Sequence, residues 1–208
     1  MTPTDSGTVS FSGDRAAVAA ALQQVADRYL DGMEPTVADA VRYALMGEGK
    51  RLRAILLIAA YRASGGSGDA SGLAAAVEVV HAYSLVHDDL PCMDDDDVRR
   101  GRPTVHKAFS VPAATAAGLA MVPMAARAAS DAAMALVGDP RVAGEIVRTL
   151  MSASGAGGMI GGQLLDLEGE LASLRLGARG LQRDGFPGAV RLLHLGVPGE
   201  LAVAAGAG

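Results

Sequence analysis

The apolar residues of this chain recur at helical spacing, and that periodicity constrains the fold more than any other feature. The positions Val18, Leu22 and Val25 fall on one helical face, and a longer periodic run extends from Leu73 to Val86. No segment shows the sustained alternation that is typical of a half-buried strand. Aromatic residues make up only 3 % of the chain, and alanine, the best helix former, supplies much of the apolar content. We therefore predict an all-α helical bundle.

Proline, glycine and capping residues place the expected helix boundaries. Asp14 is positioned to cap a helix that starts at Arg15 and runs to about Leu30. Further helices are expected to start at Pro35 and Pro140, an apolar segment covers 52–61, and a helical stretch over 111–137 contains Pro123 as a kink or break. The stretches "SGGSGDASG" (64–72) and "RRGRP" (99–103) are expected to be loops.

Length, charge and cysteine content exclude several classes of protein. The 208 residues suffice for one domain with a core, and the net charge of -5 does not favour a nucleic-acid partner. Cys92 is the only cysteine, so a disulfide framework is excluded and a reducing cytosol is favoured. The polar N-terminus does not resemble a signal peptide, and the apolar run Val111–Ala126 is expected to be a buried helix rather than a membrane span. We expect a cytoplasmic location.

Six aspartates lie within "YSLVHDDLPCMDDDDVRRGRP", residues 83–103. Asp88, Asp89 and Asp94 form a DD-x4-D pattern, and carboxylates this close repel one another unless a cation neutralises them. Oxygen-only ligands suit Mg2+. On a straight helix Asp88 and Asp94 would lie about 9 Å apart along the axis and about 240° apart around it. Pro91 disrupts the turn, which would allow both carboxylates to face one cavity.

Three arginines, Arg99, Arg100 and Arg102, follow the acidic residues directly. Guanidinium groups bind phosphate oxygens through paired hydrogen bonds, so the whole stretch favours a Mg-diphosphate site over a bare metal site. An acidic run that is merely solvated and self-neutralised remains the alternative at this point. An EF-hand fits poorly, because a loop that starts at Asp94 would place Val98 at a ligand position.

A second basic cluster lies in "GEGKRLR", residues 47–53. Lys50 and Arg53 are three residues apart, so we expect them to share a helix face near an N-terminus that favours anions. A solvated helix start is the alternative, and Arg51 is expected to be a surface charge. His81 lies seven residues before Asp88, near the same helix face, and a structural histidine is its alternative.

Gln163 and Asp166 lie three residues apart on an expected helix. They would add an amide and a carboxylate to the same cavity, with ordinary capping or a surface position as the alternative. The neighbouring stretch "GAGGMIGGQ" is unusually rich in glycine for a helix interior, which is typical of close helix packing or close ligand approach.

Three segments together resemble the trans-isoprenyl diphosphate synthases, the polyprenyl synthetase family: "GKRLRA", "HAYSLVHDDLPCMDDDDVRRGRPTVHKAF" and "GMIGGQLLDLEGE". They occur in the family order, and the resemblance covers roughly residues 15–170. It implies the isoprenoid-synthase helical bundle. It also implies that the protein joins isopentenyl diphosphate to an allylic diphosphate, dimethylallyl or geranyl, with Mg2+ as cofactor.

The resemblance also implies roles for individual residues. Asp88 and Asp94 correspond to the main Mg2+ ligands, Asp89 to a supporting carboxylate and Arg99 to a contact of the allylic diphosphate. The remaining correspondences are with isopentenyl diphosphate contacts (Lys50, Arg53, His81 and Arg100, with backbone approach at Gly49) and with a cavity-lining motif (Gln163 and Asp166).

Tyr83 lies five residues before the DD-x4-D pattern. An aromatic residue there, together with this longer pattern, resembles bacterial farnesyl diphosphate synthases, in which a ring would floor the product tunnel. The resemblance thus favours farnesyl diphosphate as product, with geranylgeranyl diphosphate next. On periodicity alone Tyr83 would be a core residue.

The resemblance ends near residue 170. Family members carry a Lys-Thr pair and a second Asp-rich motif further along, whereas the last lysine here is Lys107 and Asp184 is the only aspartate after Asp166. We expect a flexible N-terminus (1–13), the N-terminal part of the synthase domain (14–170), incomplete at its C-terminus, and a divergent, poorly ordered tail (171–208). A frameshift or truncation would explain the change.

Two function classes follow from this sequence. The first is a short-chain prenyltransferase, working as a homodimer, whose activity is weak or lost in this chain. The second is a non-catalytic diphosphate-binding subunit that pairs with a full-length relative and modulates it.

Overall fold

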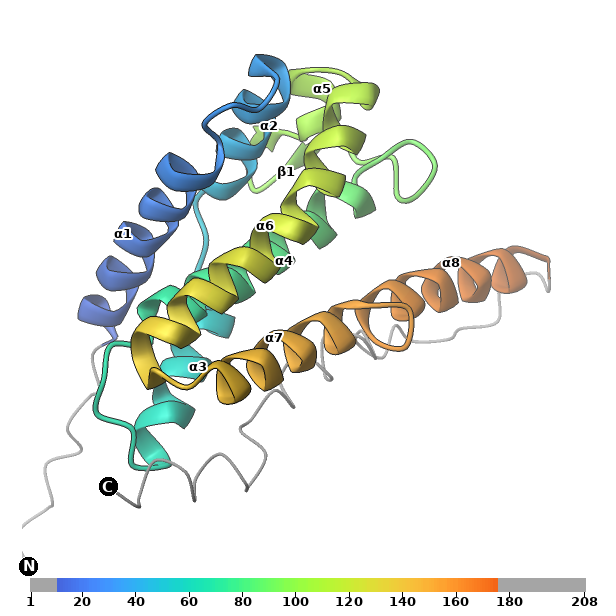
Figure 1. The fold of residues 1–208 in the computed structure, drawn as a ribbon. Coiled ribbons are helices and arrows are strands. Elements are labelled where there is room, and N and C mark those ends of the chain that lie inside the picture. The colour runs from blue at the N-terminus through green and yellow to red at the C-terminus, as the bar shows by residue number, and fades with distance from the viewer. Residues whose placement is uncertain (1–10, 176–208) are drawn as a thin grey trace, which may run out of the picture.

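The prediction of a helical bundle is confirmed by a computed structural model that describes residues 11–175. The helices are α1 (Ser12–Tyr29), α2 (Pro35–Leu45), α3 (Leu52–Ala63), α4 (Ser71–Asp88), α5 (Val105–Ala108), α6 (Val111–Val137), α7 (Pro140–Ser154) and α8 (Met159–Arg175) (Figure 1). Between α4 and α5 the chain forms a short antiparallel hairpin of β1 (Val98–Arg99) and β2 (Arg102–Pro103).

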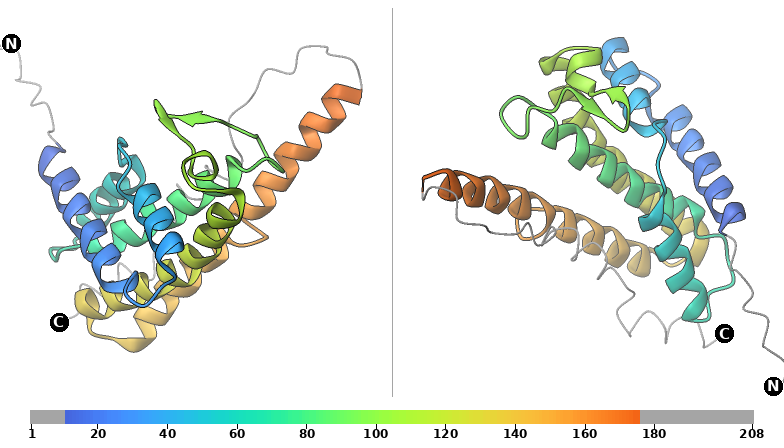
Figure 2. Two further views of the ribbon diagram at one scale, coloured as in Figure 1. Left: turned by 90° about the horizontal axis from the view of Figure 1, so that it is seen from above. Right: turned by 180° about the vertical axis from the view of Figure 1, so that it is seen from behind.

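Helices α4 and α6 lie side by side in the middle of the molecule, with α1 and α2 against them on one side and α7 against α6 on the other (Figures 1 and 2). Small residues let the two central helices approach closely. A Cβ atom on Gly118 of α6 would lie 2.2 Å from Nε2 of His87 on α4, so only glycine fits at this contact. The close approach gives the last turns of α4, which carry Asp88, a rigid support.

Helix α6 is continuous through Pro123, so the kink or break expected there does not interrupt the helix. Among the described residues it is the one helix long and apolar enough to cross a membrane. Its buried residues pack against α2, α4, α5 and α7, and this central position is typical of the core helix of a bundle.

The predicted cap of α1 is wrong. The helix begins at Ser12, which places Asp14 inside the first turn. The Asp14 carboxylate instead accepts hydrogen bonds of 2.8 and 2.9 Å from the two terminal nitrogens of Arg62, and it thereby joins α1 to α3. Pro35 and Pro140 open α2 and α7 as expected.

The expected loop 99–103 contains the turn of the β-hairpin. Arg100 and Gly101 have φ values of 52° and 76°, as a tight two-residue hairpin turn requires. Tyr43 of α2 anchors the hairpin, because its hydroxyl donates a 2.8 Å hydrogen bond to the Pro103 carbonyl and the Arg102 guanidinium lies 4.1 Å above its ring. Two arginines, Arg99 and Arg100, are thereby held in place against the bundle.

The first four residues of the glycine-rich stretch, 155–158, form the turn between α7 and α8, and the rest begins α8. A Cβ atom on Gly158 would lie 1.9 Å from the Ala153 carbonyl oxygen, so the turn requires close backbone contact. Helix α8 continues to Arg175, past the boundary expected at 170/171. The ten N-terminal residues and 176–208 of the expected tail lie outside the described residues.

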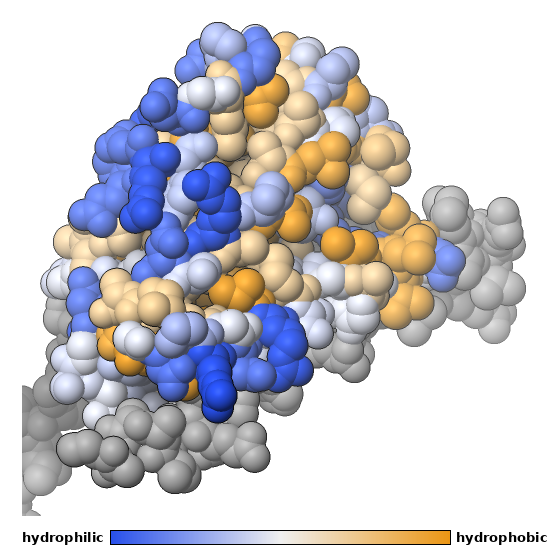
Figure 3. Space-filling model, in the orientation of Figure 1, coloured by the Kyte–Doolittle hydropathy of each residue, from blue (hydrophilic) through white to orange (hydrophobic). Residues whose placement is uncertain are grey.

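Helix α8 exposes three large apolar side chains, Ile160 (41 %), Leu164 (56 %) and Leu165 (61 %). In Figure 3 apolar residues gather on the side of the molecule where α8 lies. This surface is apolar although it lies next to the acidic end of α4.

Candidate functional site

The chain reverses direction at the end of α4 and brings the two ends of the DD-x4-D pattern together. Asp88 is the last residue of α4, and Asp89 is its C-cap. The backbone N–H of Asp94 donates a 2.9 Å hydrogen bond to the Asp88 carbonyl. The helix thus ends before Pro91, since the residue preceding a proline avoids helical geometry. The expected convergence of Asp88 and Asp94 therefore occurs at the level of the backbone.

Asp88 is buried, and its carboxylate is held by α8. Nε2 of Gln163 donates to Asp88 Oδ1 at 2.6 Å and to the Ser84 carbonyl at 3.2 Å. Burial raises the pKa of Asp88 to about 6, and the charges of Asp94 and Asp89 add to the rise, while the Gln163 hydrogen bond and Arg99 oppose it. An ionised Asp88 thus carries negative charge that its surroundings compensate only in part.

A divalent cation would supply that compensation. Asp88 and Asp94 are carboxylates on adjoining backbone, and oxygen donors of this kind are the ones that Mg2+ prefers. The donor set at the end of α4 therefore fits a Mg2+ ion.

Asp89 has a different partner. Nε of Arg99 donates to Asp89 Oδ1 at 2.6 Å, and Nη2 of the same arginine lies 3.2 Å from Asp96. The Asp89 side chain is buried, and burial raises its pKa against the opposing effect of Arg99. Asp89 thus orients the Arg99 guanidinium beside the Asp88–Asp94 pair.

A cavity of about 530 Å³ opens between α2, α4 and the hairpin. Its cationic and titratable lining comprises Arg51, Arg99, Arg100, Arg102, His81, Glu78, Glu48 and Asp89. Four of these eight side chains are arginines and three are carboxylates. Two of the arginines pair with lining carboxylates, Arg51 with Glu78 and Arg99 with Asp89. The arginines of this lining make the cavity a candidate site for an anion.

His81 is held neutral inside this basic region. Nη1 of Arg53 lies 3.2 Å from His81 Nε2, and because arginine only donates, Nε2 accepts. Burial, together with the charges of Arg53 and Arg100, lowers the pKa of His81 to about 3. Burial also lowers the pKa of Arg53, which remains charged at neutral pH. The charge of the buried Glu78 carboxylate opposes this lowering, so it balances part of the positive charge around His81.

Lys50 and Arg53 do not share a helix face, so that prediction is wrong. Helix α3 begins at Leu52, and Arg51 precedes it with a left-handed φ of 51°. Lys50 lies in the loop before the helix and is exposed, whereas Arg53 points to His81. Gly49 lies against the hairpin, and a Cβ atom there would lie 2.6 Å from Arg100 Nη1 and displace the end of that side chain. That nitrogen donates to the Glu48 carbonyl at 2.8 Å.

Arg51 is not the surface charge that the sequence predicted. Its side chain is 16 % exposed and lies 3.3 Å from the carboxylate of Glu78, which is 3 % exposed. Nη2 of Arg51 also donates to the carbonyls of Leu45 and Gly47 at 3.0 and 2.8 Å. Sequence reasoning missed Glu78, although a lone glutamate within the apolar run "AAAVEVV" indicates a buried charge that needs a partner.

The remaining predicted residues lie on α4 and α8. Tyr83 is buried, and its ring packs edge-on against that of His87 at 4.7 Å. It lies outside the lining of the basic cavity, and burial and the charge of Asp88 raise its pKa. Asp166 is partly exposed one turn beyond Gln163 and makes no hydrogen bond or ion pair with the described residues. The structure therefore brings Gln163, but not Asp166, to Asp88.

Comparisons with known proteins show which family the chain resembles. A family model described as "Polyprenyl synthetase" matches residues 34–177, a range that contains every candidate residue above. Farnesyl diphosphate synthase of Bacillus subtilis is 39 % identical over 163 residues, which cover 77 % of this chain and 54 % of the relative. A putative geranylgeranyl pyrophosphate synthase 8 of Arabidopsis thaliana is 43 % identical over 136 residues, covering 65 % and 37 %.

Solved structures of similar proteins superimpose on this chain. An FPP/GFPP synthase from Zymomonas mobilis superimposes with a TM-score of 0.71 at 35 % identity, over 87 % of this chain and 63 % of that one. A geranyltransferase from Legionella pneumophila gives a TM-score of 0.72 at 32 % identity, over 95 % and 68 %. The chain spans about half the length of the Bacillus relative.

Proposed function

Because the chain belongs to the polyprenyl synthetase family, we propose that it carries a short-chain prenyl transfer site that joins isopentenyl diphosphate to an allylic diphosphate. One observation supports this most strongly. The buried, partly uncompensated carboxylate of Asp88 lies beside Arg99, next to a cavity lined by arginines. Carboxylates for a metal ion and guanidinium groups for phosphate are the two halves of a Mg-diphosphate site.

We assign the allylic diphosphate to the end of α4. Asp88 and Asp94 would hold Mg2+, which when bound neutralises the charge of a diphosphate leaving group. Arg99 is oriented by Asp89 through Nε and by Asp96 through Nη2, and its Nη1 would contact the same diphosphate. Gln163 fixes the Asp88 carboxylate from α8. These groups are in place before substrate arrives, so little reorganisation accompanies charge development.

Isopentenyl diphosphate is assigned to the basic cavity. Arg53 and Arg100 supply positive charge, and neutral His81, whose Nε2 is occupied by Arg53, has Nδ1–H left to donate. Lys50 lies on the exposed loop beside Gly49, where glycine permits a close approach of a diphosphate to the backbone.

In the proposed reaction the bond between C1 and oxygen of the allylic diphosphate breaks, and diphosphate leaves with the electron pair. The double bond of isopentenyl diphosphate attacks the allylic cation at C1, and a new carbon–carbon bond forms. A proton is then lost from the joined product, which restores a double bond. The chain's own residues orient the two diphosphates and stabilise the negative charge that develops on the leaving group.

We propose farnesyl diphosphate as the product, with geranylgeranyl diphosphate as the alternative. Tyr83 is a buried, bulky side chain on α4, little more than one turn before Asp88. A ring at this position would limit the length of a growing prenyl chain. Replacing Tyr83 with alanine should shift the product towards longer chains, and an unchanged product length would contradict this role.

We also propose a cytoplasmic location and assembly with a second copy or a full-length relative. The exposed apolar side chains of α8, which include Leu164 and Leu165, support association. A molar mass above that of one chain in light scattering, reduced by Leu164→Glu, is the expected result. A monomer at all concentrations would contradict the homodimer.

Product formation tests the proposed function. The 208-residue chain is incubated with Mg2+, labelled isopentenyl diphosphate and geranyl diphosphate, alone and together with a full-length bacterial farnesyl diphosphate synthase. We expect weak product formation by the chain alone that Asp88→Ala abolishes and that an exposed control, Asp39→Asn, leaves unchanged. No product together with no Mg2+-dependent diphosphate binding would overturn the proposal.

The same assay separates the second candidate, a non-catalytic modulating subunit. That reading is supported by a relative of this chain, the heterodimeric geranylgeranyl pyrophosphate synthase large subunit 1 of Arabidopsis thaliana, which is 42 % identical over 135 residues. A modulating subunit would change the output of the full-length enzyme equally well with Asp88→Ala as without it. A prenyltransferase half-site would lose its effect with that substitution.

A further inference from the structure

His106 is a buried histidine with one ring nitrogen unsatisfied. Its side chain is 2 % exposed, and Nε2 makes no hydrogen bond. Among the described residues His87 Nε2 is the other buried side-chain atom without a hydrogen bond, but that atom faces Gly118 in the α4–α6 contact. His106 Nε2 instead faces carboxylates. A buried polar atom without a partner costs free energy, so its orientation needs a cause.

Thr104 fixes which nitrogen of His106 carries the proton. The Thr104 hydroxyl donates its only hydrogen to the Asp96 carbonyl at 2.7 Å. The same oxygen lies 3.2 Å from His106 Nδ1 and therefore accepts a hydrogen bond from Nδ1–H. Nε2 is left with a free lone pair. Metal-binding histidines are commonly oriented in this way, by a hydrogen bond from the other ring nitrogen.

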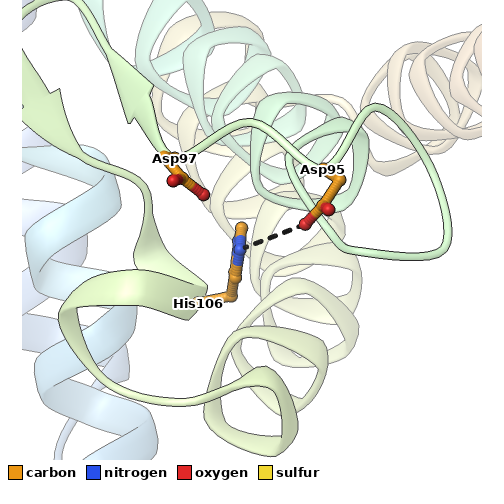
Figure 4. Close-up of side chains that lie close together, drawn as sticks. All are labelled: Asp95, Asp97 and His106. Atoms are coloured by element: carbon orange, nitrogen blue, oxygen red, sulfur yellow. Dashed lines mark ion pairs between the residues drawn. The ribbon is translucent and has the colours of Figure 1, made fainter.

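The lone pair points into an acidic cluster. Nε2 lies 4.0 Å from Asp95 Oδ1, and ligand atoms of Asp95, Asp97 and His106 all lie within 4.8 Å of one another (Figure 4). A lone pair facing carboxylate oxygens is repulsive unless a cation lies between them. Either a metal ion or a proton on His106 would remove the repulsion.

We propose that Asp95, Asp97 and His106 bind a divalent transition metal ion at a site separate from the Asp88–Asp94 pair. A mixed set of imidazole and carboxylate ligands suits Zn2+, Mn2+ or Co2+, whereas Mg2+ prefers oxygen donors only. The site lies where the hairpin leads into α5, and the proposed prenyl transfer does not require it. It would tie the acidic loop to α5 and thereby brace the arginines of the hairpin.

The geometry needs only a small adjustment to bind the ion. Metal–ligand bonds of roughly 2.0–2.2 Å place tetrahedral donors about 3.4 Å apart, somewhat closer than they lie here. The Asp95 and Asp97 side chains are 61 % and 72 % exposed, so no packing prevents them from rotating inwards, while His106 is buried. Lys107 lies 2.7 Å from Asp97 Oδ1 and competes for that oxygen. The second oxygen of the carboxylate remains for the metal.

Zinc titration of the full chain tests the site. Isothermal titration calorimetry with Zn2+ is performed in excess Mg2+, which occupies oxygen-only sites, on wild type, Asp95→Asn, His106→Gln and the neighbouring control Asp96→Asn. We expect one Zn2+ per chain, with affinity at least tenfold weaker in Asp95→Asn and His106→Gln and retained in Asp96→Asn. Asp95 is exposed, so its substitution keeps the test valid if His106→Gln fails to fold.

Nitrogen-15 chemical shifts of the histidine side chains give a second readout. Addition of Zn2+ should shift the Nε2 resonance of His106, assigned by its loss in His106→Gln, and Asp95→Asn should suppress the shift. Wild-type chain without Zn2+ binding, or with binding unaffected by Asp95→Asn, would overturn the proposal. A His106 that is already doubly protonated at pH 7 and insensitive to Zn2+ would also overturn it, because a proton would then fill the place of the metal.

Discussion

At the scale of single residues, the neighbours of each charged group decide what it can do. Asp88 and Asp89 are adjacent and both buried, yet one is bound by the amide of Gln163 and the other by the guanidinium of Arg99. The negative charge of Asp88 is therefore left to bind a cation, whereas the charge of Asp89 is paired with Arg99 and orients it. His81 differs from an ordinary histidine because burial and surrounding arginines remove its proton.

His81 should make the fold sensitive to acid. Its pKa is about 3 in the folded chain and about 6.5 when unfolded, so the unfolded state binds more protons between these values. The contribution of neutral His81 to the free energy of unfolding is present above pH 6.5 and is lost as the pH falls towards 3. Between pH 7 and pH 5 this loss amounts to about 2 kcal/mol of unfolding free energy. His81→Gln, which keeps an acceptor for Arg53, should remove that part of the acid sensitivity.

Urea unfolding at pH 7 and pH 5 measures the effect. The difference between wild type and His81→Gln isolates this histidine from the carboxylates that titrate in the same range. An equal loss of stability in both proteins would show that His81 is not held neutral.

At the scale of elements, loops and turns position the site more than the helices do. The α2–α3 loop is fixed by Arg51, which bridges Glu78 of α4 and two carbonyls at the end of α2. The hairpin is fixed on α2 by Tyr43. The α7–α8 turn aims Gln163 at Asp88 through glycines that permit close backbone contact.

Removal of Arg51 should be strongly destabilising. Arg51→Met leaves Glu78, which is 3 % exposed, without its ion-pair partner, and breaking a buried pair from one side costs about 3–5 kcal/mol. Replacing both residues with methionine should recover much of that loss, because no unpaired charge remains. Unfolding free energies of the two single variants and the double variant measure the coupling. Additive effects of the single substitutions would contradict a direct pairing.

In the α7–α8 turn, the loss of stability on replacing glycine with alanine should depend on the position. Gly158→Ala should destabilise the chain by about 2 kcal/mol, because its Cβ would lie 1.9 Å from the Ala153 carbonyl oxygen and force the backbone apart. Gly157→Ala is the matched control, since a Cβ there has no other atom within 4 Å. Thermal unfolding compares them, and equal melting temperatures for the two variants would contradict the tight turn.

At the scale of the whole molecule, the periodicity of apolar residues predicted the long helices of the bundle. Helical spacing predicted the bundle, and Pro91 predicted that Asp94 would return to Asp88. Periodicity could not predict the hairpin, whose strands are two residues long each and too short to alternate. It also could not place Lys50 off the helix, because that depends on the left-handed backbone of Arg51.

Contacts between distant segments were equally beyond a single sequence. Arg51 meets Glu78 only after α3 packs on α4, and His106 reaches Asp95 only after the hairpin has folded. Sequence spacing also predicted a contact that the structure does not show. Gln163 and Asp166 were expected to line one cavity because they lie three residues apart, but of the two only Gln163 contacts Asp88. Pattern and resemblance predicted where a site would lie, whereas the partners of its charges depend on three-dimensional packing.

The central claim is that Asp88, Asp94 and Arg99 form a Mg2+-dependent diphosphate site. Asp88→Asn removes the charge but keeps an oxygen that can accept from Gln163. Since burial raises the pKa of Asp88, removal of this buried charge should not destabilise the fold, and thermal unfolding checks this.

The most direct measurement is calorimetric titration of geranyl diphosphate into the 208-residue chain, with Mg2+ and with EDTA, for wild type, Asp88→Asn and the exposed control Asp39→Asn. We predict binding that requires Mg2+, is unchanged in the control and is at least tenfold weaker in Asp88→Asn. Binding that persists in EDTA, or that Asp88→Asn leaves unchanged, would contradict the account.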